Sequence, residues 1–258
     1  MVSIKSAAAV ANMKLAGKVV YDALCAVKAA VRPGISTMDL DVIAEEVITN
    51  AGAKPSFKGY NGFPASICAS IDGEVVHGIP SRKRLLRDGQ IISIDCGAIV
   101  NGYHGDSALT IPVGDISEEA QLLIKRTEEA FWEAFKVIRH GARLNDIGHA
   151  VQSYVEAFGY GVVRELCGHG IGRNMHEDPE VPNYGTKGTG IRLSEGMTIA
   201  VEPMITAGKP AVSLGEDKWI VFTKDGSLAA HYEHTLLVTK GLPVILTLPD
   251  ELQEGFTG

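Results

Sequence analysis

The sequence repeats itself, and this repeat constrains the fold more than any other feature. At an offset of 107 positions, the difference between Arg32 and Arg139, similar residues align without a gap. The aligned pairs are Gly34 with Gly141, Asp39 with Asp146, Gly52 with Gly159, Leu86 with Leu193, Gly89 with Gly196, and Asp95 with Glu202. Glycines alone are common at helix ends in any chain. The matching charged and apolar positions favour a duplicated structural unit instead.

Each unit is predicted to hold two helices and a pair of strands. Apolar residues spaced by three and four indicate helices, and Asn-Gly between apolar segments indicates a tight hairpin. The first unit has a helix over residues 10–31 closed by Pro33-Gly34, a helix capped by Thr37 and closed by Gly52, a strand Ile91–Val100, the turn Asn101-Gly102 and a strand over residues 103–113.

The second unit repeats this order. It has a helix capped by Ser117 or Asp115 and running to about Arg139, a helix capped by Asn145 and closed by Gly159, a strand over residues 197–206, and a hairpin of residues 219–224 and 227–239 around Asp225-Gly226. At 258 residues the chain fits neither one nor two domains of about 150 residues. We therefore predict a single domain, residues 1–258, whose halves 1–113 and 114–258 share one site around a pseudo-twofold axis.

Two aspartates are predicted to share one face of the first hairpin. With a two-residue loop at Asn101-Gly102, Gly97 pairs with Asp106, and Asp95 points to the same face as Gly97. The two carboxylates are then diagonal neighbours, about 7–8 Å apart at the backbone. Like charges on a half-buried face repel, and a cation between them removes the repulsion. The alternative is a pair of solvent-facing aspartates on the polar side of the sheet.

Glu202 and Glu233 interrupt two other apolar strand sequences, IAVEPMI and AHYEHTLLV. A charged residue rarely buries without a partner, and neither segment contains Lys or Arg. Four acids in strand interiors without matching bases favour a metal site over salt bridges. His169 lies between two glycines, which let a backbone approach closely. Alone it would be a hydrogen-bonded loop residue, but with four carboxylates it completes a ligand set for two divalent ions about 3.5–4 Å apart.

Four further histidines lie near these segments. His77 and His176 stand in loops beside Gly or Pro, where each could stabilise an oxyanion, position a substrate amide, or serve the structure alone. His231 and His234 flank Glu233 and are candidates for hydrogen bonds to it. The sequence contains no HExxH, no Walker A motif and no GxSxG. It therefore lacks the motifs of HExxH metalloproteases, P-loop nucleotide-binding proteins and α/β-hydrolases.

The segments that carry these residues resemble those of the methionine aminopeptidases. The matching segments are Asp95 with Asp106 eleven residues later, CGHGIGRNMHEDPEVPNY, IAVEPM and HYEHTLLV, and the resemblance runs from about residue 5 to residue 244. The chain is similar to the short type I form found in bacteria. The resemblance implies the α+β class and the pita-bread fold, in which two pseudo-symmetric α/β halves flank a curved antiparallel sheet.

The resemblance also implies a role for each candidate residue. Asp95 would bind one metal ion, His169 and Glu202 the other, and Asp106 and Glu233 would bridge both; Glu202 would also shuttle a proton, while His77 and His176 would contact the scissile amide. The walls of the methionine side-chain pocket would be Tyr60, Phe63, Cys68 and Trp219. Leu166 stands where the family usually has an aromatic residue or Met, and Met175 where Phe is frequent, which leaves the shape of the pocket open.

The activity that the resemblance implies is dimetal-dependent removal of the initiator methionine from nascent proteins whose second residue is small. The ligands suit Co, Mn, Fe or Zn ions. The implied partners are nascent polypeptide amino termini at the ribosome. The alternatives are a Pro-specific aminopeptidase or prolidase-like peptidase of the same fold, and a non-catalytic peptide-binding relative.

Composition argues against several other classes of protein. Lys and Arg number 24 against 31 Asp and Glu, a net charge of −7, and the sequence lacks the basic stripe of a nucleic-acid-binding protein. No apolar run has the length of a membrane span or the pattern of a secretory signal. Because the four cysteines show no CxxC spacing, we expect a reduced, cytoplasmic protein. We also expect a monomer.

Overall fold

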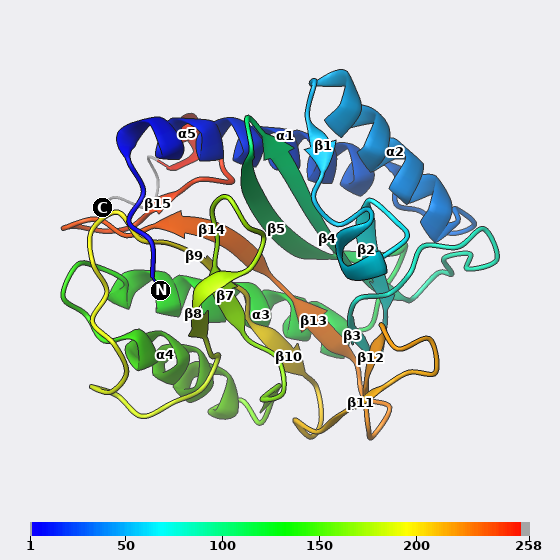
Figure 1. Ribbon diagram of the computed structural model, residues 1–258. Helices are drawn as coiled ribbons and strands as arrows, with labels where there is room; N and C mark the ends of the chain where they lie inside the picture. Colours follow the sequence, from blue (N-terminus) through cyan, green and yellow to red (C-terminus); the bar gives the residue numbers. More distant parts are fainter. Residues whose placement is uncertain (1, 254–258) are drawn as a thin grey trace.

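A large antiparallel sheet forms the centre of the molecule (Figure 1). The computed structural model describes residues 2–253, and within them nine strands join this central sheet. The order is β1-β4-β5-β14-β9-β7-β8, with β2 also beside β4 and β15 beside β14. The bounds are β1 Lys54–Pro55, β2 Ile67–Ile71, β4 Ile91–Val100, β5 Tyr103–Pro112, β7 Gly168–Gly170, β8 Glu177–Val181, β9 Thr198–Val201, β14 Glu233–Leu237 and β15 Val244–Ile245.

Two small antiparallel sheets complete the strands of the described residues. One has the order β13-β10-β6 and the other β11-β12-β3. The bounds are β3 Glu74–Val76, β6 Gly161–Val162, β10 Met204–Thr206, β11 Val212–Leu214, β12 Val221–Thr223 and β13 Ala229–His231. Because β3 pairs with β12, the second small sheet joins segments that are far apart in the sequence.

The long helices cover the central sheet in two pairs (Figure 1). In the first pair one helix packs on β4 and β5 and the other on β1 and β2. In the second pair one helix packs on β10 and β13 and the other on β6 and β8. The bounds are α1 Ala7–Ala30, α2 Thr37–Asn50, α3 Glu118–Val137 and α4 Leu144–Glu156, followed by the short helix α5 Asp250–Gln253; Tyr60–Gly62 form a 3₁₀ turn. Each pair buries its own apolar cluster, one around Leu24 and Ile94 and the other around Phe131 and Ile199.

Two glycines bring α1 into backbone contact with the sheet. A Cβ at Gly17 would lie 1.9 Å from the carbonyl oxygen of Leu246, and a Cβ at Gly105 on β5 would lie 2.8 Å from the backbone nitrogen of Gly17. No side chain fits at either distance, so only glycine allows the helix to cross β5 this closely.

Several local features recur at the offset found in the sequence. An isolated bridge joins Ser36 to Leu85, and another joins Arg143 to Arg192, which are 107 positions further on. At the start of α2 the backbone N–H of Ser36 donates to the Asp39 carboxylate at 3.2 Å, and at the start of α4 that of Arg143 donates to Asp146 at 3.1 Å. The paired acids therefore close the same turn in both halves.

The predicted helix caps at Thr37 and Asn145 are wrong by one or two residues. The caps are Ser36, whose hydroxyl accepts from the backbone N–H of Asp39, and Arg143. Thr37 is buried and its hydroxyl donates to the carbonyl of Ser81, while the side chain of Asn145 donates to Thr189. Tertiary partners thus take up both side chains that the sequence pattern assigns to capping. The predicted cap Ser117 is confirmed.

The first predicted hairpin is confirmed, including its register. Val100 pairs with Tyr103, so Asn101-Gly102 is a two-residue loop, and Gly97 pairs with Asp106. The chain thus places Asp95 and Asp106 on the same face of two adjacent strands. This register fixes the relative positions of the first two acidic residues of the site.

Two predictions about the second half are wrong. The predicted strand over residues 197–206 breaks after Val201 into β9 and β10, which lie in different sheets, because Pro203 has no N–H to continue the ladder. The predicted last hairpin does not form, because β12 pairs with β11 and β3 while β13 pairs with β10. A chain reversal at Asp225-Gly226 is present, but the strands on either side find other partners.

Within the described residues, no helix combines the length and apolar character needed to cross a membrane. All four cysteines are free thiols.

Candidate metal centre

One cavity of about 260 Å³ collects every residue predicted to take part in the chemistry. The predicted residues on its walls are Tyr60, Phe63, Cys68, His77, Asp95, Asp106, His169, His176, Glu202, Trp219 and Glu233. Leu166 and Met175, the two departures from the family pattern, also line it. Residues that are far apart in the sequence, from Tyr60 to Glu233, therefore line the same cavity.

Three carboxylates lie across adjacent strands of the central sheet. Asp95 on β4 and Glu233 on β14 both pair with Ala108 of the strand between them, β5. Directly opposed residues share a face of the sheet, and the small side chain of Ala108 separates the two acids. Asp106 lies on the same strand as Ala108, two residues away and therefore on the same face.

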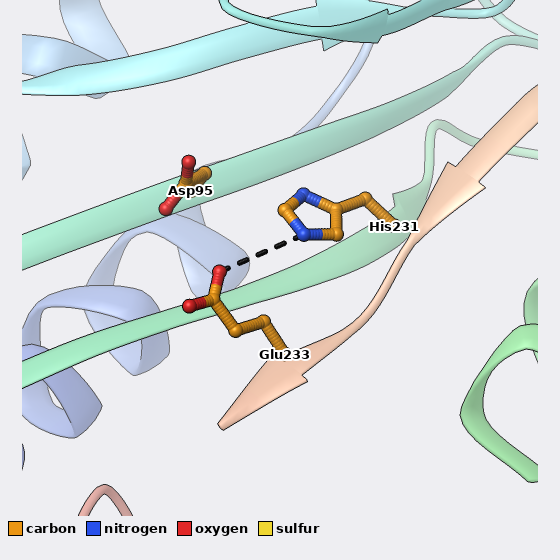
Figure 2. A group of neighbouring side chains, drawn as sticks. All are labelled: Asp95, His231 and Glu233. Atoms are coloured by element: carbon orange, nitrogen blue, oxygen red, sulfur yellow. Dashed lines mark ion pairs between the residues drawn. The ribbon is translucent and has the colours of Figure 1, made fainter. Parts of the chain in front are cut away.

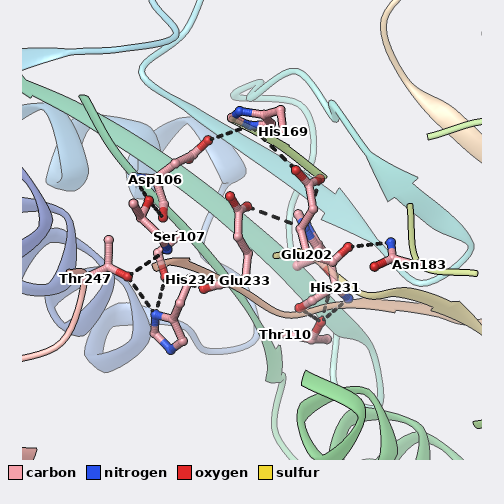
Figure 3. Close-up of polar contacts among 12 residues, drawn as sticks. Asp106, Ser107, Thr110, His169, Asn183, Glu202, His231, Glu233, His234 and Thr247 are labelled. Atoms are coloured by element: carbon pink, nitrogen blue, oxygen red, sulfur yellow. Dashed lines mark hydrogen bonds and ion pairs between the residues drawn. The ribbon is translucent and has the colours of Figure 1, made fainter. Parts of the chain in front are cut away.

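His169 and Glu202 approach this row from the other half of the chain (Figure 3). The Nε2 atom of His169 lies 3.6 Å from Oε1 of Glu202 and 3.7 Å from Oδ2 of Asp106. Its Nδ1 atom lies 2.8 Å from the carbonyl oxygen of Gly170, which can only accept, so Nδ1 carries the proton. In the neutral ring the lone pair is then on Nε2 and faces the carboxylates. His169 lies on β7, a strand, where the sequence predicted a loop.

Burial makes the ionised state of these acids costly. Asp106 and Glu233 are 3% and 2% exposed. Burial, reinforced by the neighbouring carboxylates, raises the pKa values of Asp95, Glu202 and Glu233 well above their usual range, and burial raises the pKa of Asp106 to about 7. Without a compensating cation the cluster holds protons near neutral pH.

The two other predicted histidines are neutral bases and donors on the cavity wall. Burial lowers the pKa of His176 to about 4 and also lowers that of His77. The Tyr60 hydroxyl lies 2.8 Å from Nδ1 of His176, and the His176 ring lies beside that of His169, with centroids 4.3 Å apart. His77 holds a positive φ of 62°, which is uncommon for a residue with a side chain.

Aromatic and sulfur-containing side chains form the apolar wall. The Phe63 and Trp219 rings meet edge to face with centroids 5.1 Å apart. Cys68 on β2 pairs with Asp95, which places its buried thiol directly beside the carboxylates. An apolar wall with sulfur suits a flexible thioether side chain.

Known proteins share the sequence pattern and the fold of this chain. Residues 11–240 match the family model described as metallopeptidase family M24. The chain belongs to this family. The methionine aminopeptidase of Clostridium acetobutylicum is 54% identical over 248 residues, covering 96% of this chain and 99% of that protein. Methionine aminopeptidase 1 of Bacillus subtilis is 49% identical and covers 93% of this chain and 96% of its own length.

Solved structures of two known proteins have the same architecture. The methionine aminopeptidase of Thermotoga maritima aligns with a TM-score of 0.95 at 42% identity, covering 96% of this chain and all of that one. The prolidase of Pyrococcus furiosus aligns with a TM-score of 0.77 at 23% identity, over 96% of this chain and 66% of that one, and shares the fold alone. The predicted pita-bread fold and the predicted membership of the short bacterial methionine aminopeptidases are confirmed.

A metallopeptidase uses divalent metal, and the buried groups of this cavity fit that need. Ligand atoms of Asp95, His231 and Glu233 lie within 4.8 Å of one another (Figure 2). Those of Asp106, His169 and Glu233 also lie within 4.8 Å of one another. Among the described residues, one buried oxygen each of Asp95, Asp106 and Glu233 has no hydrogen-bond partner. Such oxygens are hard ligands, and a cation would satisfy them.

His231 belongs to one of these two groups but is absent from the predicted ligand set. The sequence placed it beside Glu233 only as a hydrogen-bonding candidate. A usable signal was present, because two residues of one extended segment separated by a single position point to the same face. The structure places its ring in the cavity wall with the acids.

Proposed function

We propose that this chain is a methionyl aminopeptidase that removes the initiator methionine from nascent proteins whose second residue is small. The observation that carries the proposal is the single cavity in which four carboxylates, two of them on the buried residues Asp106 and Glu233, and His169 adjoin a wall of aromatic rings and sulfur. The 54% identity to a methionine aminopeptidase over nearly the full length supports it. The prolidase relationship is limited to fold at 23% identity.

We propose that two divalent ions, drawn from Co, Mn, Fe and Zn, occupy the cluster. Asp95 would hold one ion, His169 and Glu202 the other, and Asp106 and Glu233 would bridge them. Bound ions of this kind supply Lewis acidity and lower the pKa of water at the site. Glu233 belongs to both groups of neighbouring ligand atoms, which supports its bridging role.

Glu202 would move the proton of the reaction. Its carboxyl lies on the cavity wall, with Oε1 3.6 Å from Nε2 of His169, where it can take a proton from one reacting group and return it to another. The Asn183 side chain donates to the backbone carbonyl of Glu202 at 2.9 Å and holds the chain where β9 ends. Glu202 therefore lies at the break between β9 and β10, where its backbone is held by this hydrogen bond.

His77 and His176 would bind the scissile amide. Both are neutral at pH 7 because their pKa values are lowered, so each offers a ring N–H or a lone pair without adding charge. The hydrogen bond between Tyr60 and Nδ1 of His176 orients this ring and leaves Nε2 for the substrate. Donors fixed in this way stabilise charge that develops on the carbonyl oxygen.

Tyr60, Phe63, Cys68 and Trp219 would surround the methionine side chain, with Leu166 and Met175 shaping the rest of the cavity. We propose that the chain acts as one catalytic domain of two halves, 1–113 and 114–258. We further propose that it acts as a cytoplasmic monomer on nascent chains at the ribosome, without specific nucleic-acid or membrane binding.

The test is a panel of peptides with the metal-free protein reconstituted with Mn²⁺, Co²⁺ or Fe²⁺. We expect hydrolysis of Met-Ala-Ser and little hydrolysis of Leu-Ala-Ser or Leu-Pro-Ser. A preference for Pro at the second position with no requirement for Met would instead identify a prolidase-like enzyme. Binding of these peptides without hydrolysis under every metal would identify a non-catalytic relative.

A further inference from the structure

His231 lies at the end of β13, two residues before Glu233, and its side chain is 2% exposed. Tyr232 between them packs its ring against Phe131 of the core, with centroids 5.3 Å apart, so His231 and Glu233 turn to the opposite face. Figure 2 shows both side chains converging with Asp95 from three different strands.

The imidazole of His231 lacks any hydrogen-bond partner within the described part of the chain, at Nδ1 and at Nε2. Its neighbour His234 has an opposite environment, with Nδ1 2.9 Å from the Thr247 hydroxyl and Nε2 3.1 Å from the Tyr232 hydroxyl. A buried polar group without a partner costs about 1–3 kcal/mol, so a fold that satisfies one imidazole and leaves the adjacent one bare calls for an explanation.

The distances from His231 to the neighbouring carboxylates fit metal ligation, and its ligand atom lies within 4.8 Å of those of Asp95 and Glu233. Nε2 lies 3.6 Å from Oε2 of Glu233 and 3.8 Å from Oε2 of Glu202 (Figure 3). A hydrogen bond would be shorter, about 2.7–3.2 Å, whereas two atoms each about 2.0–2.2 Å from a metal ion lie up to about 4.4 Å apart. The matching distances from Nε2 of His169 are 3.6 and 3.7 Å.

We propose that His231 is a sixth protein ligand, so that each of the two metal positions carries one imidazole. His169 would serve the ion held by Glu202, and His231 the ion held by Asp95, with Asp106 and Glu233 shared by both. This inference rests on the dinuclear centre of the proposed function. An imidazole at the Asp95 position would add a nitrogen donor to a site otherwise made of oxygen, which favours Co²⁺, Fe²⁺ or Zn²⁺ over Mn²⁺.

The test counts metal-bound imidazoles in the full-length protein loaded with two equivalents of Co²⁺. The ring N–H proton of a histidine bound to paramagnetic Co²⁺ gives a strongly shifted proton resonance that disappears in D₂O. We expect two such resonances in the wild-type protein. The H231Q variant should keep only the resonance of His169, and the H169Q variant only that of His231. H149Q, on α4 and outside the cavity wall, serves as the matched control and keeps both.

Calorimetric titration with Co²⁺ gives a second readout. We expect H231Q to weaken one binding event by at least the roughly 10- to 100-fold that loss of even an outer partner of a ligand costs. Circular dichroism verifies that the variant is folded. If H231Q does not fold, the number of exchangeable resonances in the wild-type protein still shows whether one or two imidazoles bind metal.

Two outcomes would overturn the role of His231. They are a single exchangeable resonance in a wild-type protein that binds two Co²⁺ ions and hydrolyses Met-Ala-Ser, or two unchanged resonances in H231Q. Both leave the proposed aminopeptidase intact. Failure of the wild-type protein to bind Co²⁺ would overturn the dinuclear centre and the His231 ligand together.

Discussion

Replacing Asp106 with Asn should stabilise the metal-free protein, and the gain should grow with pH. Asp106 is 3% exposed on β5, and burial raises its pKa from 3.8 to about 7. At a pH between these two pKa values, the folded protein therefore keeps a proton that the unfolded protein has released. For an acid whose pKa rises on folding, stability is greatest at low pH and is lost as the pH rises toward the folded pKa.

The size of the effect follows from the two pKa values. Between pH 5 and pH 7 the wild-type protein should lose about 2 kcal/mol through Asp106, because each unit of pKa difference is worth about 1.4 kcal/mol and the group is half ionised at pH 7. Asn does not titrate, so the difference in unfolding free energy between D106N and wild type should widen by this amount. At about 2–4 °C per kcal/mol the difference in Tm grows by about 4–8 °C.

The assay is thermal and urea unfolding of EDTA-treated proteins at pH 5, 6 and 7. Comparing the two proteins removes the contribution of the buried histidines, whose lowered pKa values change stability in the opposite direction over this range. D22N, at an exposed i,i+4 ion pair, is the control and should show no widening difference. A difference between D106N and wild type that stays constant from pH 5 to 7 would refute the claim that Asp106 is protonated by burial.

Three further predictions follow from the site and the packing. Glu202→Gln should lower kcat by at least about 100-fold through loss of proton transfer, with the thermal melt retained; near wild-type turnover would contradict the role of Glu202. Trp219→Ala should reduce the preference of kcat/KM for Met-Ala-Ser over Ala-Ala-Ser by about tenfold or more, and an unchanged ratio would remove Trp219 from the pocket. Gly17→Ala should destabilise the fold by about 1–3 kcal/mol in urea unfolding, because its Cβ would lie 1.9 Å from the Leu246 carbonyl; the neighbouring K18A at the surface should change little.

Features set by neighbouring residues were predictable from the sequence alone. Asn101-Gly102 specifies a two-residue turn, and the alternation of side chains in a strand then places Asp95 and Asp106 on one face without any tertiary information. The apolar surroundings of Glu202 and Glu233 similarly indicate carboxylates that need a cation, because a desolvated charge is costly wherever the chain lies.

Features that depend on which segments meet were decided by the tertiary structure. The turn at Asp225-Gly226 predicts a hairpin, yet β12 and β13 pair with other strands, because a local turn signal carries no information about competing partners. His231 lies two residues before Glu233 in the sequence, and His234 lies directly after it. Packing supplies hydroxyl partners from Thr247 and Tyr232 to one imidazole, and leaves the other facing two carboxylates. Hydrogen bonds and metal ligation both depend on groups from distant segments, so only the folded chain distinguishes the two histidines.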